Sequence, residues 1–342
     1  MEFRINNRAK HSIYKQIVEQ IEKAIRDGSL TPGDMLPSMN VLAARHNISR
    51  ETVKNAYGIL VDKDLIEPRH GKGFYVKDIS HDTRMKVLVI FDKLSVYKEI
   101  LLESLSNHLG QAAEITILNH DQNIDLLEYY LDTHLDSFDY YVIAPHFPRK
   151  DEEQQKRIVK LLERVPVRKL IMIDNLQAGM KGSFGAVYQD FDNDMYDCLE
   201  KSIDASDRVT RLRVLTLASS MYGPRISKSI ERFAAKHFIE AECMPGVPDD
   251  IERGDTFILL NSSLDAGIVE LSRKLKENGL EVGRDVRIIS YNEYPMNELI
   301  LGGLTTVSTD FPEMGRLTAE MILNRKLEKL RNPFRMTRRK SF

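Results

Sequence analysis

Apolar residues near the start of the chain recur every three or four positions, at Ile13, Ile17, Ile21, Ala24 and Ile25. This spacing predicts an amphipathic helix that has Ser12 as its N-cap and stops at Gly28. The next segment, LTPGDMLPS, contains two prolines and a glycine, which exclude regular helix. A second helix is predicted over residues 39–45, with Ser38 as its N-cap.

A third helix and a hairpin follow at once. Ser49 is another N-cap, and the segment after it, which runs to about Asp64, carries one apolar face formed by Val53, Ala56, Tyr57 and Leu60. Two helices joined by a four-residue turn resemble a helix-turn-helix. Residues 65–68 and 74–76 predict two short strands around the basic turn RHGKG. The combination predicts a winged helix.

The start of the third helix carries candidate DNA contacts. In a helix-turn-helix the second helix turns its first residues toward the bases of the major groove. Here these residues are Ser49, Arg50, Glu51, Thr52 and Lys54, where the helix dipole also favours phosphate. A solvated helix start explains these residues equally well on their own, and the adjoining basic hairpin shifts the interpretation toward DNA.

The rest of the chain follows a different pattern. Short, continuous apolar runs alternate with amphipathic stretches of helical length, and the runs are VLVIF (87–91), EITIL (114–118), YYVIA (140–144), KLIMI (169–173), RVLTL (213–217), TFILL (256–260) and VRIIS (286–290). Continuous runs indicate strands buried on both faces, and alternation with helices indicates parallel sheets. The pattern predicts an α/β body of two doubly wound halves.

Polar residues follow the predicted strands where a ligand would bind. In such sheets ligands lie beyond the carboxyl ends of the strands, and in a two-lobed protein they lie between the lobes. Carboxylates, amides and aromatic faces at these ends suit a hydroxyl-rich ligand such as a sugar. Arg225 could meet an anionic group or stay solvated. Each of these polar residues, taken alone, is more simply explained as a helix cap or a loop residue. The hypothesis of a sugar-binding site therefore depends on all of them together.

Length indicates the number of domains, and charge is distributed unevenly along the chain. At about 150 residues per domain, 342 residues indicate roughly two domains. The net charge is −2, but residues 1–78 carry 13 Lys and Arg against 10 Asp and Glu, so the basic excess lies in the predicted winged helix. Cys198 and Cys243 form no disulfide framework and are expected to be buried thiols. No signal peptide or membrane span is present, so a cytoplasmic protein without a membrane partner is expected.

Enzyme motifs are absent from the sequence. It contains no G-x-x-x-x-G-K-[ST] phosphate loop, no H-E-x-x-H and no G-x-S-x-G, and its nine histidines lack metal-ligand spacing. We expect neither a cofactor nor a metal, although a metal site assembled from distant residues stays open. An enzyme is the minor alternative. The other alternative to a ligand-responsive protein is a constitutive DNA-binding scaffold, in which the α/β body serves only for dimerisation.

Residues 10–77 resemble the DNA-binding domain of the GntR family of bacterial transcription regulators. The resemblance depends on G-x-L-x-P-G-D-x-L-P-S, S-R-x-T-V and a final G-x-G-F-x-V, in order and at family spacing. It implies that Arg50, Thr52 and Lys54 touch phosphate or base edges and that the hairpin reaches the minor groove. The chain has Asn40 where the family commonly has arginine, so a charged contact becomes neutral. The full expected DNA-binding set is Ser38, Asn40, Ser49, Arg50, Thr52, Lys54, His70, Gly71 and Lys72.

Residues 85–342 resemble the periplasmic-binding-protein-like effector domain of lactose-repressor-type regulators. The matching segments include KENGLEVGRDVRIISYNE and GGLTTVSTDFPEMGRLTAEMIL. The resemblance implies effector contacts at Asn261 and Asn292, the second at a place where many relatives carry aspartate, and it sets Asn193 near a place where sugar-binding relatives often have arginine. The full expected effector set is Asp92, Tyr97, His146, Asp174, Asn193, Arg225, Asn261 and Asn292.

Together these features predict a DNA-binding domain over residues 1–78, a linker over 79–85 and a two-lobed effector and dimerisation domain over 86–342. The resemblance implies three chain crossings between lobes, near 189–191, 307–309 and 326–330. Lobe 1 would then hold residues 86–189 and 309–326, and lobe 2 residues 191–306 and 330–342. The expected protein is a homodimeric transcription regulator, a repressor, that binds a double-stranded DNA operator and responds to a sugar-like effector.

Overall fold

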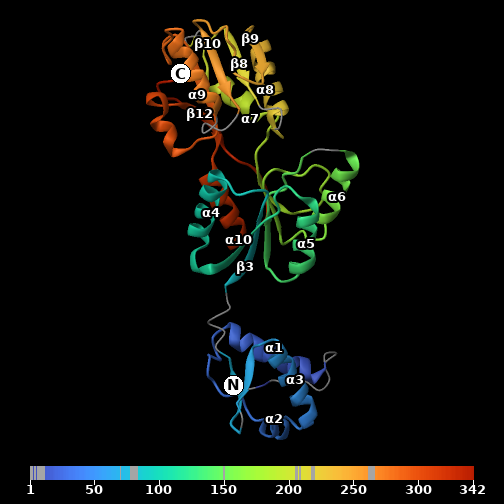
Figure 1. The fold of residues 1–342 in the computed structure, drawn as a ribbon. Helices are drawn as coiled ribbons and strands as arrows, with labels where there is room; N and C mark the ends of the chain where they lie inside the picture. The colour runs from blue at the N-terminus through green and yellow to red at the C-terminus, as the bar shows by residue number, and fades with distance from the viewer. Residues whose placement is uncertain are drawn as a thin grey trace. The chain divides into compact units, whose positions relative to one another are not determined.

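The computed structural model describes residues 3, 5, 12–69, 71–77, 84–148, 151–204, 207, 209–216, 220–260 and 266–342. The chain divides into two compact units, Met1–Arg84 and Met85–Phe342 (Figure 1). The predicted contact residues His70 and Asn261, and most of the predicted linker, lie outside the described residues.

The first unit is a winged helix. It contains α1 (Ile13–Arg26), α2 (Met39–His46), α3 (Arg50–Asp62), β1 (Ile66–Arg69) and β2 (Gly73–Val76). The two strands are antiparallel, and the segment before α2 extends the hairpin because the Leu36 N–H donates to the Phe74 carbonyl and the Val76 N–H to the Asp34 carbonyl. Asn47 ends α2 in the left-handed conformation that Asn tolerates. The predicted apolar faces meet in one core, which includes Ile17, Ile21, Leu42, Val53, Tyr57 and Leu60.

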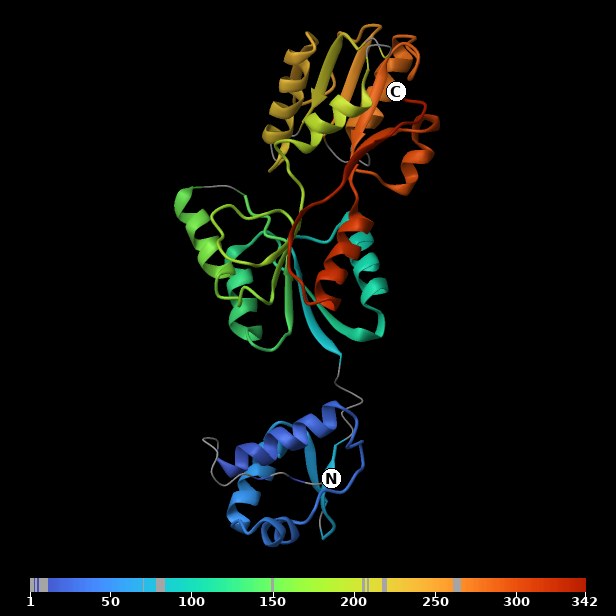
Figure 2. The ribbon, with the colours of Figure 1, turned by 180° about the vertical axis from the view of Figure 1, so that it is seen from behind.

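The second unit contains two sheets, which define its two lobes (Figure 2). Lobe 1 contains β3 (Met85–Phe91), α4 (Val96–Leu109), β4 (Ala113–Asn119), α5 (Ile124–His134), β5 (Tyr140–Ile143), α6 (Glu152–Leu162), β6 (Leu170–Asp174), β7 (Gly185–Tyr188), α10 (Phe311–Leu323) and β13 (Lys329–Arg331). Lobe 2 contains α7 (Asp194–Ser202), β8 (Arg211–Leu215), α8 (Gly223–Lys236), β9 (Glu240–Met244), β10 (Asp255–Leu259), α9 (Ala266–Glu277), β11 (Arg287–Tyr291), β12 (Thr305–Thr309) and β14 (Phe334–Thr337).

The sheets are almost entirely parallel, as predicted. The strand order is β13-β7-β6-β5-β3-β4 in lobe 1 and β14-β12-β11-β10-β8-β9 in lobe 2, and the antiparallel pair in these sheets is β12 with β14. All seven predicted apolar runs overlap strands, although β8 begins two residues before its run. The pattern missed β7, β9, β12, β13 and β14. The edge strands β9, β13 and β14 are partly exposed, so they require no continuous apolar run. β7 and β12 are mostly buried but were missed because β7 is short and begins with glycine and β12 consists mainly of threonine and serine.

The chain changes sheet three times within this unit. It leaves lobe 1 after β7, returns between β12 and α10, and leaves again between β13 and β14. The third change follows Arg331 and thus comes after the expected 326–330, because residues 329–331 first add a parallel strand to β7.

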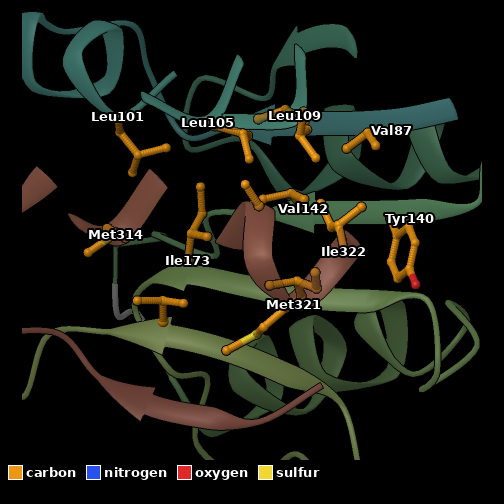
Figure 3. Packing of buried hydrophobic residues seen from close by; sticks show 14 of the residues in the cluster. Val87, Leu101, Leu105, Leu109, Tyr140, Val142, Ile173, Met314, Met321 and Ile322 are labelled. Carbon is orange, nitrogen blue, oxygen red and sulfur yellow. The ribbon is translucent and has the colours of Figure 1, made fainter. Parts of the chain in front are cut away.

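Helices cover both faces of the lobe 1 sheet and hold its strand ends in place. Figure 3 shows Leu101 and Leu105 of α4 and Met314 of α10 among the buried side chains on one face. The two helices approach closely at Gly315, where an added Cβ would lie 2.5 Å from the Leu101 carbonyl oxygen. The opposite face is covered by α5 and α6 through Leu127, Leu131, Ile158 and Leu162.

Candidate functional site

The start of α3 presents an exposed polar surface. The Ser49 hydroxyl caps the helix by accepting the Thr52 N–H at 3.1 Å, and it lies 2.8 Å from the Thr52 hydroxyl. Arg50 is exposed and forms no ion pair with any residue that the structure describes. Lys54 pairs with Glu51 at 3.1 Å, but both side chains are mostly exposed, so the pair holds Lys54 weakly. Arg50 is therefore the group at this helix start that is most available to a phosphate or a base.

The other predicted DNA contacts lie on α2 and in the hairpin. Ser38 caps α2 by accepting the Val41 N–H at 3.2 Å, and Asn40, the second residue of the helix, is exposed. Gly71 has a φ of +70° and forms the exposed hairpin turn with Lys72. Such a turn favours glycine, because side chains disfavour this backbone region. Arg69, which was not among the predicted residues, lies 4.5 Å above the Tyr75 ring.

A buried polar cluster lies beyond the carboxyl ends of the lobe 1 strands. Three of its members are predicted effector residues, Asp92 after β3, His146 after β5 and Asp174 at the end of β6. Lys98 of α4 reaches the same place, where its ammonium contacts Asp174 and lies 3.4 Å from Asp92 Oδ1. His146 Nε2 lies 2.9 Å from Asp174 Oδ2. The structure thus brings these three predicted residues together around a lysine.

Asp174 is the centre of this cluster. Its carboxylate accepts hydrogen bonds from Lys98, from His146 and from the Gln189 side-chain amide. Burial alone would raise the pKa of Asp174, but the charges of Lys98 and His146 hold it well below its usual range. Burial also acts to lower the pKa of Lys98, but the two carboxylates raise it overall. Asp174 and Lys98 therefore form a charged, internally satisfied pair.

Two tyrosines of lobe 2 join the cluster. The Tyr222 hydroxyl, at the N-terminus of α8, lies 2.5 Å from His146 Nδ1, and the Tyr222 ring stacks on Phe191 at 3.8 Å between centroids. The Tyr291 hydroxyl, at the end of β11, donates to Gln189 Oε1 at 3.2 Å. Side chains from both lobes therefore share one hydrogen-bonded network. A cavity of about 30 Å³, room for about one water, is lined beside it by Pro145 and Phe147 of lobe 1 and by Met221 and Tyr222 of lobe 2.

Three buried oxygen atoms at the carboxyl ends of strands lack a hydrogen bond within the described part of the chain: Asp92 Oδ1, Thr216 Oγ1 and Asn292 Oδ1. Each residue follows the carboxyl end of a strand, in β3, β8 and β11 respectively. Asn292 directly follows Tyr291, whose hydroxyl belongs to the network. Buried polar groups in native proteins are nearly always paired, so these atoms mark a place where a bound molecule can supply the missing partners.

The remaining predicted effector residues have other partners. Arg225 forms a two-pronged ion pair with Asp192, and its guanidinium lies 5.7 Å from the centre of the Phe191 ring. Asn193 donates to Asp190 at 2.7 Å. Tyr97 stacks on Phe311, with the ring centres 5.3 Å apart.

Sequence reasoning missed Lys98, Gln189, Phe191 and Tyr222. Lys98 had a usable signal, since it falls on the apolar stripe of α4 with Leu101, Leu105 and Leu109, where a lysine needs a buried partner. Gln189 and Phe191 lie in the first crossing between lobes, where the sequence has neither helical periodicity nor an apolar run that could have marked them. The expectation of buried thiols was wrong for Cys243, which is exposed on the edge strand β9, whereas Cys198 is buried.

Neither a metal cluster nor a membrane span is found in the described parts of the chain. The searched residues include no group of three or more His, Cys, Asp or Glu able to hold a metal ion. None of the described helices is long and apolar enough to cross a bilayer.

The chain joins a winged helix to a two-lobed α/β unit, an architecture of bacterial regulatory proteins, and comparison with known proteins gives its family. Residues 13–76 match the model for bacterial regulatory proteins of the gntR family, and residues 227–341 match a periplasmic binding protein-like domain. The chain belongs to the GntR family. Both sequence resemblances are thereby confirmed.

Two curated relatives match the N-terminal part. The mannosyl-D-glycerate transport/metabolism system repressor MngR of Escherichia coli (strain K12) is 36% identical over 113 residues, which cover 30% of this chain and 47% of MngR. The HTH-type transcriptional repressor YtrA of Bacillus subtilis (strain 168) is 32% identical over 97 residues, which cover 28% of this chain and 71% of YtrA. The match thus spans about half the length of MngR. Both relatives are named repressors, in agreement with the expectation of a protein that is not an enzyme.

Solved structures confirm the fold of the body. The Lac repressor bound to ONPG in the repressed state has a TM-score of 0.58 at 14% identity, covering 86% of this chain and 90% of that chain. The Escherichia coli transcriptional repressor ascG also has a TM-score of 0.58 at 14% identity, covering 76% of this chain and 99% of that chain. At such identities the likeness establishes the fold alone.

Proposed function

We propose that this chain is a cytoplasmic, homodimeric repressor whose affinity for a pseudo-palindromic operator is controlled by a sugar or sugar derivative bound between the lobes of its body. The observation that carries the effector site is a set of three buried oxygens, on Asp92, Thr216 and Asn292, that lack a hydrogen bond within the described residues, together with a network shared by both lobes. Hydroxyl groups of a sugar can donate to all three.

Control of DNA affinity then follows from linkage. An effector that contacts both lobes favours one arrangement of the body over another. It changes operator affinity by the ratio of its own affinities for the two arrangements. The buried hydrogen bonds that cross between lobes, His146 with Tyr222 and Gln189 with Tyr291, are the contacts that such a ligand would reorganise.

A second copy of the chain is the proposed partner of an apolar surface on lobe 2. Val269 of α9, Met296 and Leu299 are exposed, and Val269, Ile300 and Leu301 line a common hollow. Symmetric dimers bury such self-complementary surfaces, and a two-fold dimer matches a pseudo-palindromic operator. We expect Leu299→Asp to shift the sedimentation coefficient of the chain from dimer to monomer. A wild-type chain that sediments as a monomer at micromolar concentration would contradict the dimer.

Thermal unfolding of the full chain against mono- and disaccharides, sugar acids and purines tests the effector site. A ligand present at 100 times its Kd stabilises the folded state by about 2.7 kcal/mol, which raises the Tm by several degrees. Stabilisation by a sugar supports the proposal. If no compound stabilises the chain, the constitutive scaffold is the better account, and turnover of a stabilising compound would instead indicate an enzyme.

A further inference from the structure

The buried cluster contains two carboxylates but one ammonium group. Asp92 and Asp174 contribute two negative charges, and Lys98 is the one lysine or arginine that the described residues place in ion-pair contact with either. His120, stacked on Phe147, adds no positive charge near neutral pH, because burial lowers its pKa. The cluster's carboxylates thus outnumber its lysine and arginine side chains by two to one. This imbalance is buried, since Asp92, Lys98 and Asp174 are each at least 94% shielded from solvent.

Arg225 does not supply a second positive charge to the two carboxylates of this cluster. Arg225 is held by both carboxylate oxygens of Asp192, and Asp190 lies close enough to raise the pKa of Arg225 further. An anionic ligand would have to compete with Asp192 for this guanidinium. Lys98 and Arg225 therefore each already have a carboxylate partner from the chain itself.

The two carboxylates of the cluster differ in what they can still bind. Asp174 accepts three hydrogen bonds from the chain, whereas Asp92 Oδ1 accepts none from the described residues and lies 3.4 Å from the Lys98 ammonium. An ionised carboxylate can only accept hydrogen bonds. The free position on Asp92 therefore requires a donor on the ligand, such as a hydroxyl group.

We propose that the effector is a polyhydroxylated molecule without a carboxylate or phosphate group, and that Asp92 is the specificity-determining residue that accepts one of its hydroxyls and repels anions. This inference depends on the proposed effector site. A further negative charge beside Asp92 would be buried next to a carboxylate, while Lys98 and Arg225 already have carboxylate partners, and a low-dielectric site penalises such a charge strongly.

Matched pairs of ligands test the inference: glucose with glucuronate, galactose with galacturonate, and glucose with glucose 6-phosphate, each titrated calorimetrically into the full chain. In every pair that binds, the neutral member is expected to bind at least tenfold more tightly. Preference for an anionic member would overturn the inference and leave the proposed effector site standing. If no pair member and no other neutral mono- or disaccharide binds, both the effector site and this inference fail.

Asp92→Asn isolates the role of the carboxylate. The amide preserves the shape but removes the charge, so we expect the neutral sugar to bind at least tenfold more weakly and the discrimination against its anionic partner to fall at least tenfold. Glu103→Gln removes the same charge from the exposed side of α4 and should leave both quantities unchanged. If Asp92→Asn folds and retains wild-type discrimination, Asp92 is not the determinant. If it does not fold, the wild-type pairs alone decide the charge class.

Discussion

His146 Nδ1 lies 2.5 Å from the Tyr222 hydroxyl. This contact joins the segment after β5 in lobe 1 to the N-cap residue of α8 in lobe 2, and the other nitrogen of the same imidazole contacts Asp174. One histidine therefore connects the charged cluster of lobe 1 to lobe 2. A ligand that binds at the cluster can change the lobe contact directly.

Tyr222→Phe removes this hydroxyl and keeps the ring that stacks on Phe191. Because one buried hydrogen bond contributes about 1 kcal/mol, we expect roughly a fivefold change in effector affinity, measured by calorimetry. Tyr130→Phe is the matched control, since its hydroxyl bonds to the Asn119 carbonyl within lobe 1. An equal effect of both variants on effector affinity would show that Tyr222 does not couple ligand and lobes.

Asn292→Ala should retain DNA binding and lose the response to effector, because it removes an unpartnered buried oxygen at the end of β11. Asn292 has a φ of +72°, which alanine disfavours by about 1 kcal/mol. Asn292→Gly removes the same side chain without this strain and should lose the response equally. A normal response in the glycine variant would exclude Asn292 from the effector site.

Arg50→Ala should weaken binding to the preferred DNA sequence by tenfold or more, because a base or phosphate contact from arginine contributes about 1–3 kcal/mol. The fold should persist, since Arg50 is exposed. Fluorescence anisotropy at fixed salt measures the affinity, and circular dichroism checks the fold. Lys15→Ala removes an equal charge from the exposed side of α1 and should have little effect. Unchanged affinity in Arg50→Ala would remove this residue from the interface.

Asp194 provides a pH test of the connection between lobes. It belongs to α7 of lobe 2 and pairs with Arg331 of β13 in lobe 1 at 2.7 Å. Burial raises the pKa of Asp194 from 3.8 to about 6, although Arg331 opposes the rise. Between these values the folded chain binds the proton more tightly than the unfolded chain, so this contribution to stability falls as pH increases.

Relative to Asp194→Asn, wild type should therefore lose about 2 kcal/mol of unfolding free energy between pH 4.5 and 6.5. Denaturant unfolding followed by tyrosine fluorescence can measure the difference between the two proteins at each pH. A difference that is constant, or that grows with pH, would contradict the raised pKa of Asp194.

The sequence predicted the winged helix and the buried strands well because both depend on local periodicity and capping. It also identified Asp92, His146 and Asp174, since residues at the carboxyl ends of parallel strands meet at one edge. It could not assign Arg225, because the choice of Asp192 as its partner depends on how the first crossing folds. Likewise, the contact of Gln189 with Tyr291 joins residues 102 positions apart and leaves no sequence pattern.

The central claim is that one chain binds specific DNA and adjusts this binding to an effector. The most direct measurement is the Kd of the full chain for a duplex that it enriches from a random pool, with and without a sugar that raises its Tm. We predict an enriched, pseudo-palindromic sequence and at least a tenfold change in Kd when the sugar is present. Failure to enrich any sequence, or an equal Kd with and without the sugar, would contradict this account.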